Sequence, residues 1–198
     1  MKSIDIAGSL RTETGKKATR DLRRNDQVPC VLYGVNKDEK GLPVATHFTV
    51  TVEGLRKLVY TPHIYVVNLN IDGQVVNAIM KDIQFHPVTD AILHVDFYQI
   101  NEEFPITMEV PVQLEGLAEG VRAGGKLVMQ VRKLKVKALY NNVPERMVIN
   151  VTNLGLGKTI KVGDLHYDNL EILNAKDTVV CAVKLTRAAR GAQAAAAK

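Results

Sequence analysis

The sequence predicts a mainly β protein built from two domains. Most of the 198 residues fall in short runs rich in β-branched and aromatic side chains, the composition typical of strands. Turns that contain glycine separate many of these runs. Many short strands joined by such turns favour small barrels or sandwiches over a parallel sheet with crossover helices.

Six strands are expected in the first half of the chain. Between the fourth and fifth strands stands Asp72-Gly73, a strong hairpin signal, because both central positions of a type I′ turn need a positive φ. The expected strands are residues 2–10, 28–35, 44–52, 64–71, 75–85 and 92–100.

Two short helices interrupt these strands. Residues 16–24 lack β-branching except at Thr19, and Ala18 and Leu22 stand four apart as a minimal apolar stripe. A second helix is expected over residues 52–60, with Thr51 as its N-cap, although Gly54 weakens that prediction.

The strand pattern breaks at Asn-Glu-Glu-Phe-Pro, residues 101–105, which marks a candidate domain boundary. A second β-rich stretch follows, in residues 106–114, 126–139, 147–151 and 179–185, with a glycine-rich loop at 119–125. We therefore expect a first domain over residues 1–100 and a second over 101–186. The Ala-rich basic tail, 187–198, is low in complexity and is expected to be flexible.

The composition limits the cellular compartments and the classes of protein that fit this chain. No run approaches the roughly 20 apolar residues that span a bilayer, and the N-terminus lacks an apolar signal core. Cys30 and Cys181 lie far apart, which suits a reducing compartment and gives no case for a zinc site. We expect a cytoplasmic protein with no membrane partner.

Charge is distributed unevenly. The formal net charge is only +5, but basic side chains gather in residues 11–24, in 132–137 and after 184. The first group holds Arg11, Lys16, Lys17, Arg20, Arg23 and Arg24 against two acids. Local basic patches on a nearly neutral chain indicate docking on a polyanion. A merely solvated basic helix face explains the same charges about equally well.

Two further features are candidates for recognition. His94 and Asp96 stand two apart on an expected strand, so their side chains share one face and can bond bases or ribose. A structural His–Asp hydrogen bond, or less plausibly a metal or catalytic site, accounts for the same pair. Tyr33 ends an apolar run beside Gly34, where its ring packs either on a ribose or against the core.

Enzyme motifs fail on inspection. The segment Gly155-Leu-Gly-Lys-Thr159 looks like the end of a P-loop, but Thr152 stands where that pattern requires a glycine. No GxSxG elbow, HExxH motif or acidic metal cluster is present. We expect no catalytic residue, metal, cofactor or small-molecule substrate.

Several motifs together resemble those of a known family. They are Arg11-Thr-Glu-Thr-Gly-Lys16, Arg23-Arg-Asn-Asp-Gln-Val-Pro-Cys-Val-Leu-Tyr-Gly34 and His94-Val-Asp-Phe97, with Gly120-Val-Arg-Ala-Gly-Gly125, Val143-Pro-Glu145 and Leu154-Gly-Leu-Gly157 in the second half. The chain resembles the bacterial large-subunit ribosomal protein L-twenty-five family over residues 2–185. The second half is similar to the C-terminal domain of its longer form, known as the CTC or general stress protein form.

The resemblance implies an N-terminal β-barrel with short helices that binds the loop E region of 5S ribosomal RNA, and a second, mainly β domain. It also implies RNA-binding roles at matching positions. These are Arg11, Lys16, Arg20, Arg23, Tyr33, His94 and Asp96. Neighbouring large-subunit ribosomal proteins are further possible partners.

Some positions depart from the family pattern. Lys81 stands where the short form carries a glutamine near the RNA, so that contact is altered. A different reading also stays open, in which the second domain is a protein–protein or stress-response module and the basic helix is merely solvated.

Overall fold

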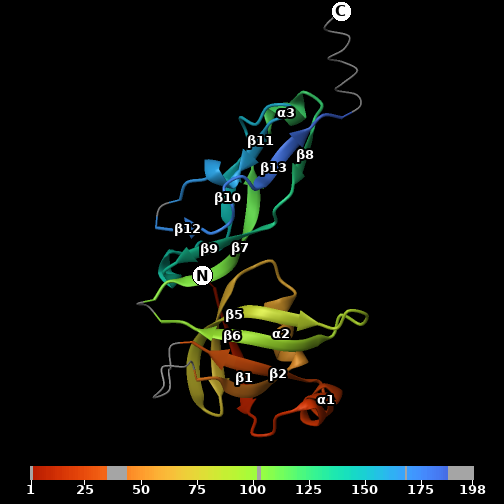
Figure 1. Cartoon of the computed structure of the whole chain (residues 1–198), viewed down its shortest axis with the longest axis vertical. Coiled ribbons are helices and arrows are strands. Elements are labelled where there is room, and N and C mark those ends of the chain that lie inside the picture. Colours follow the sequence, from red (N-terminus) through yellow and green to blue (C-terminus); the bar gives the residue numbers. More distant parts are fainter. Residues whose placement is uncertain (1, 35–43, 102–103, 168, 187–198) are drawn as a thin grey trace, which may run out of the picture. The chain divides into compact units, whose positions relative to one another are not determined.

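The computed structural model describes residues 2–34, 44–101, 104–167 and 169–186 (Figure 1). The expected Ala-rich tail lies outside the described residues. The chain divides into two compact units, Met1–Phe104 and Pro105–Lys198. This division lies within the interruption that the sequence shows at residues 101–105.

Six strands of the first unit form a closed barrel in the order β1-β3-β2-β6-β5-β4. The β1–β4 and β2–β6 pairs are parallel, and the other pairs are antiparallel. The bounds are β1 Lys2–Leu10, β2 Gln27–Tyr33, β3 Thr46–Thr51, β4 Tyr65–Ile71, β5 Gln74–Phe85 and β6 Ile92–Gln99. The predicted mainly β class and the barrel are confirmed.

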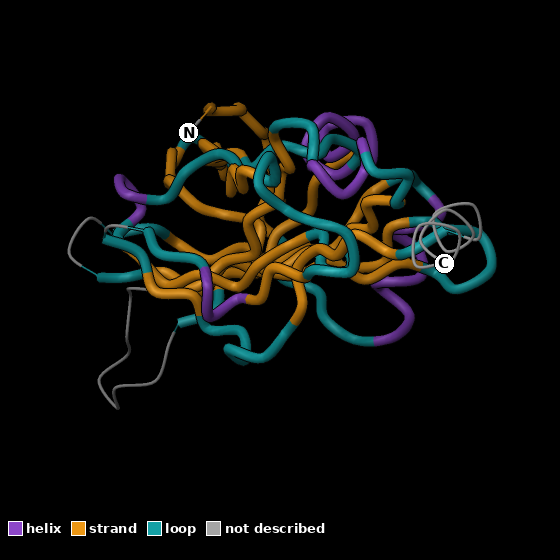
Figure 2. The backbone as a smooth tube through the Cα atoms, turned by 90° about the horizontal axis from the view of Figure 1, so that it is seen from above, coloured by secondary structure: helices purple, strands orange, loops and turns teal. Residues whose placement is uncertain are grey.

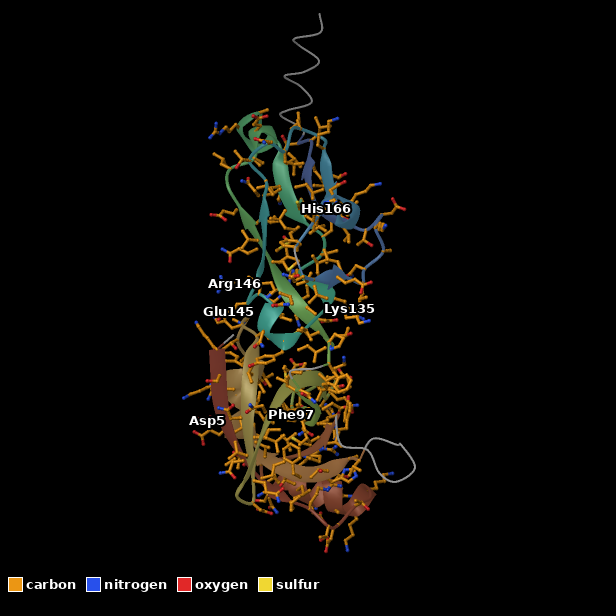
Figure 3. All side chains as sticks on the ribbon, turned by 90° about the vertical axis from the view of Figure 1, so that its left-hand side faces the viewer. Asp5, Phe97, Lys135, Glu145, Arg146 and His166 are labelled. Carbon is orange, nitrogen blue, oxygen red and sulfur yellow. The ribbon has the colours of Figure 1, made fainter. Side chains whose placement is uncertain are left out.

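Alternating side chains of these strands fill the barrel. Phe48 and Phe97 are fully buried, with ring centroids 5.7 Å apart, and Phe97 is labelled inside the barrel in Figure 3. A Cβ on Gly8 would lie 2.8 Å from the Phe48 ring, so glycine lets β1 pass close to this pair. Asp5, three residues before Gly8 on β1, is exposed and accepts a hydrogen bond from Asn68 Nδ2 at 2.7 Å (Figure 3).

The hairpin between β4 and β5 has the predicted turn. Asp72 and Gly73 have φ of 47° and 92°, as a type I′ turn requires. Asn70 Oδ1 accepts from the Gly73 N–H at 3.0 Å, and Asp72 Oδ2 accepts from the Leu10 N–H at 3.0 Å. The turn therefore also anchors the end of β1.

Both helices of the first unit occur where the sequence predicts them. Helix α1 spans Lys16–Arg24 and α2 spans Val52–Val59. The Thr51 side chain accepts from the Gly54 N–H at 3.2 Å and caps α2. Leu55 and Leu58 of α2 are buried in the barrel core, whereas α1 buries no residue. Most side chains of α1 are therefore exposed to solvent, including all of its lysines and arginines.

The second unit contains a four-stranded sheet, β10-β7-β9-β12, and a three-stranded sheet, β11-β13-β8. Strand is the main regular structure here as well, and the helical turns are short. Figure 2 distinguishes the strands (orange) and helices (purple) of the whole chain. The bounds are β7 Ile106–Glu115, α3 Glu119–Arg122, β8 Lys126–Met129, β9 Lys133–Ala138, η1 Tyr140–Asn142, β10 Met147–Asn150, β11 Thr159–Lys161, η2 Val162–Asp164, β12 Glu171–Ile172 and β13 Val179–Lys184.

Two expectations for the second unit need correction. Residues 126–139 form two strands in different sheets, because the N–H groups of Gln130 and Val131 both donate to Val180 O and the chain then turns away. The loop expected at 119–125 contains the one-turn helix α3, in which the Val121 and Arg122 N–H groups donate to Ala118 O. No helix in the described ranges is long and apolar enough to span a bilayer.

Candidate nucleic-acid interface

Helix α1 carries the densest group of cations in the first unit. Its side chains line a shallow surface hollow, formed by Lys16, Lys17, Arg20, Asp21 and Arg24. Arg24 Nη1 lies 3.8 Å from Asp21 Oδ1, an exposed pair that contributes little to stability. Lys16, Lys17 and Arg20 have no carboxylate partner within the described residues. Their charges are therefore available to an external anion.

Arg23 is oriented differently from the other basic residues of α1. Its Nε and Nη2 groups both donate to the main-chain carbonyl oxygen of Leu93, at 3.0 and 2.8 Å. The planar guanidinium suits such a two-fold contact. This contact joins the C-terminal end of α1 to the beginning of β6. Arginine has five N–H donors, so others remain beyond the two that these bonds use.

His94 and Asp96 follow Leu93 on the outer face of β6. His94 Nδ1 lies 2.7 Å from Asp96 Oδ1, and since an ionised carboxylate has no proton to give, the ring N–H donates. The two side chains are 26% and 29% exposed. In the neutral ring this bond leaves Nε2 as an acceptor, and Asp96 keeps a second oxygen. The predicted side-by-side placement is confirmed, whereas the role of the pair stays a prediction.

Strands β2 and β5 flank β6 and extend this face. Tyr33 of β2 is in register with Tyr98 of β6, and their rings meet edge to face with centroids 6.0 Å apart. Lys81 Nζ lies 5.9 Å from the Tyr98 ring centroid, in cation–π range. Asp82 of β5 is in register with Asp96.

The pKa of the Tyr33 hydroxyl reflects the charges that surround it on this face. Burial raises the pKa of Tyr33, and the nearby charges of Asp96 and Asp82 raise that pKa further. The two carboxylates therefore make the centre of the face acidic, while cations stand around it. Such an arrangement suits hydrogen bonding to bases and ribose at the centre and phosphate contacts at the rim.

Arg11 begins the loop that leads from β1 to α1. Its main-chain N–H donates to His47 O, and its Nε donates to Glu13 O, both at 3.1 Å. Burial raises the pKa of the Cys30 thiol to about 12, with Asp96 raising it and Arg11 lowering it. Arg11 and Asp96 therefore both lie close enough to Cys30 of β2 for their charges to affect its thiol.

Apart from Arg11, which lies in the loop before α1, the predicted residues fall into two groups in the structure. Tyr33, His94 and Asp96 share the outer face of β2 and β6, and Arg23 contacts the main chain at its edge. Lys16 and Arg20 lie on the exposed part of α1.

Two residues of the same face, Tyr98 and Lys81, were not among those predicted to bind. Tyr98 had a signal in the sequence, because it continues the alternation of His94 and Asp96 at i+4. Lys81 was marked only by the family resemblance, as a departure from a glutamine near the RNA, whereas the register shift between Met80 and Asp82 that sets its placement had no signal in the sequence.

Two family models match the chain. The model described as the Ribosomal L25p family matches residues 6–97, and the model described as Ribosomal protein TL5, C-terminal domain, matches residues 105–187. The chain is 77% identical over 198 residues to the large ribosomal subunit protein bL25 of Phocaeicola vulgatus, with 100% of both chains covered.

Other similar proteins carry the same description. The large ribosomal subunit protein bL25 of Bacteroides thetaiotaomicron is 64% identical over 203 residues, with 100% of both chains covered. That of Porphyromonas gingivalis is 53% identical over 193 residues, with 97% of each chain covered. The similarity therefore extends over both units.

Proposed function

Because the chain belongs to the ribosomal L25p family and also carries a TL5-type C-terminal domain, we propose that it is a structural constituent of the large ribosomal subunit that binds 5S ribosomal RNA. The bound segment is the loop E region. The protein acts on the ribosome in the cytoplasm, with neighbouring large-subunit proteins as further partners. No chemical reaction forms part of this role.

The contact between Arg23 and Leu93 is the observation that carries the proposal. It fixes the basic helix α1 to the strand residue that precedes His94. A group of cations without internal partners is thereby held beside a partly exposed His–Asp pair. Phosphate contacts position a protein on RNA, and acceptors and donors on a shaped surface read its groove.

Each residue has a distinct part in this interface. Arg11, Lys16, Arg20 and Arg23 neutralise phosphates, and Arg23 does so with the donors that Leu93 leaves unused. Tyr33 packs on a ribose with Tyr98 behind it. His94 and Asp96 offer an acceptor nitrogen and a carboxylate oxygen to base edges or 2′-hydroxyl groups.

A salt-dependent titration tests the proposal. The full chain is titrated with 5S ribosomal RNA at several salt concentrations, with tRNA as competitor. We expect binding that resists tRNA and weakens steeply with salt. Binding that tRNA abolishes would instead support the alternative, in which α1 is only solvated and the second unit is a protein–protein or stress-response module.

A matched pair of variants makes the titration specific to α1. The double variant Lys16→Gln with Arg20→Gln should lower the slope of log affinity against log salt by about 1.4–1.8, at roughly 0.7–0.9 for each phosphate contact. The control is Arg56→Gln with Lys57→Gln, which removes the same charge from the exposed surface of α2. Equal slopes for the two variants would exclude α1 as the docking surface.

A further inference from the structure

The positive charge of the chain belongs to the second unit. Residues Pro105–Lys198 carry fourteen Lys and Arg against eight Asp and Glu, whereas Met1–Phe104 carries twelve against thirteen. The unit that contains the proposed 5S interface is therefore nearly neutral. The excess of cations lies where the proposed function assigns no ligand.

The four-stranded sheet neutralises its own lysines. On β9, Lys135 is in register with Glu109 of β7, and Lys137 is in register with Glu171 of β12. Lys133 Nζ also lies 3.9 Å from Glu109 Oε2. The side chain of Lys135 is labelled in Figure 3. The basic run at residues 132–137 is thus matched by acids across the strands, which favours a structural role for it.

In the three-stranded sheet, Lys161 of β11 pairs with Asp177 at 3.3 Å, but the lysines of the β8–β13 pair are not matched by acids. Lys126 of β8 is the direct register partner of Lys184 of β13 in an antiparallel pair, and both side chains are exposed. Side chains so paired have Cβ atoms about 4.5–5.5 Å apart, and like charges there repel. Neither ammonium group has a carboxylate partner within the described ranges.

Arg122 extends this pair. It ends helix α3, which contacts β8, and the loop that follows α3 is tied to the end of β13 by the Thr186 hydroxyl, which donates to Gly124 O at 2.6 Å. Glu119 stands one turn before Arg122 on α3, yet the two form no ion pair among the described residues. The fold thus gathers three cations at one end of the sheet without balancing them.

We propose that Arg122, Lys126 and Lys184 form a second anion site, which binds the sugar–phosphate backbone of ribosomal RNA. A phosphate between the two lysines relieves the repulsion that the sheet itself leaves uncompensated. Flexible lysines without a shaped pocket suit repeating phosphates, which are bound through charge and without regard to sequence. The assignment of RNA as the polyanion rests on the proposed function.

The test compares two double variants of the full chain. The double variant Lys126→Gln with Lys184→Gln removes the two lysines that face each other across β8 and β13. The double variant Lys135→Gln with Lys137→Gln removes the same charge from the four-stranded sheet, where acids face the lysines. The probe is large-subunit ribosomal RNA, 5S and 23S together, freed of protein. We expect the first variant to lower the salt slope of binding by about 1.4–1.8, and the second to leave it within error of the unaltered chain.

Two controls separate the possible causes. The melting temperature of the first variant should be unchanged or raised, because a repulsion is removed, and Lys184→Gln alone should give about half of the slope change. Equal slope changes in both double variants, or none in either, would overturn the proposal. A different result would contradict the proposed function. In the titration with tRNA as competitor, the unaltered chain would then bind 5S RNA no more tightly than tRNA.

Discussion

Arg23 and Leu93 are joined by two hydrogen bonds, from Nε and Nη2 of the guanidinium to one carbonyl oxygen. The contact links α1 to β6, two elements that are far apart in the chain. Because Leu93 directly precedes His94, this side-chain contact helps to set the position of the basic helix relative to the His–Asp pair. Arg23 is therefore both a structural residue and a proposed RNA ligand.

Replacement of Arg23 by alanine should affect stability and binding together. We expect the free energy of unfolding to fall by about 1 kcal/mol, since the lost hydrogen bonds are exposed. Affinity for 5S RNA should fall by about 1–3 kcal/mol. Urea denaturation and RNA titration measure the two effects. Arg24→Ala, which breaks only an exposed ion pair, should leave stability unchanged.

His94 and Asp96 should behave as a unit in RNA binding. We expect His94→Ala and Asp96→Ala each to weaken 5S RNA binding by about 1 kcal/mol, because each loses its own contact and misorients its partner. The double variant should lose less than the sum, by about 0.5 kcal/mol or more. Strictly additive losses would show that the 2.7 Å hydrogen bond has no part in recognition.

Cys30 should make the barrel sensitive to alkali. The pKa of its thiol has the ordinary value of 9.0 in the unfolded chain, and burial raises this pKa to about 12 in the folded protein. Between these values the unfolded state binds fewer protons, so the free energy of unfolding falls as the pH rises. Denaturation at pH 8 and pH 10 measures the decline. Cys30→Ala should give a shallower decline, and an equal one would contradict the assignment.

The turn between β4 and β5 should not tolerate a side chain at Gly73. Its φ of 92° is unfavourable for an L-residue, while a Cβ there would meet no atom within 4 Å. Gly73→Ala should therefore cost about 1–2 kcal/mol through backbone conformation alone. Val75→Ala, at a side chain 66% exposed in the same hairpin, should change stability by less than about 0.5 kcal/mol. Thermal or urea denaturation separates the two.

Local signals predicted much of the fold. The bounds of α1, the Thr51 cap and the positive φ values at Asp72 and Gly73 all follow from short-range chemistry, and the structure confirms them. The family expected from the motifs is confirmed by both family models. The division of residues 126–139 between two sheets was missed, because Val180 sets it from far along the chain.

Local sequence signals predicted part of the candidate site, as they did for the fold. The alternation of a strand was enough to place His94 beside Asp96. The bond from Arg23 to Leu93 was not predictable, because it joins residues 70 apart and uses a main-chain acceptor that no motif marks. The contacts of Tyr98 with Tyr33 and Lys81 were not predictable either, because cross-strand packing and a register shift set them.

The topology of the barrel also sets an order of events during synthesis. Strand β6 is the last strand of the barrel to leave the peptidyl-transferase centre, and it pairs with both β2 and β5. A nascent chain that ends before β6 has open edges on both of those strands and no closed barrel. The same strand bears His94 and Asp96. Closure of the barrel and the first appearance of the proposed recognition pair are thus one event, so a chain that ends before β6 carries the cations of α1 but lacks the His–Asp pair.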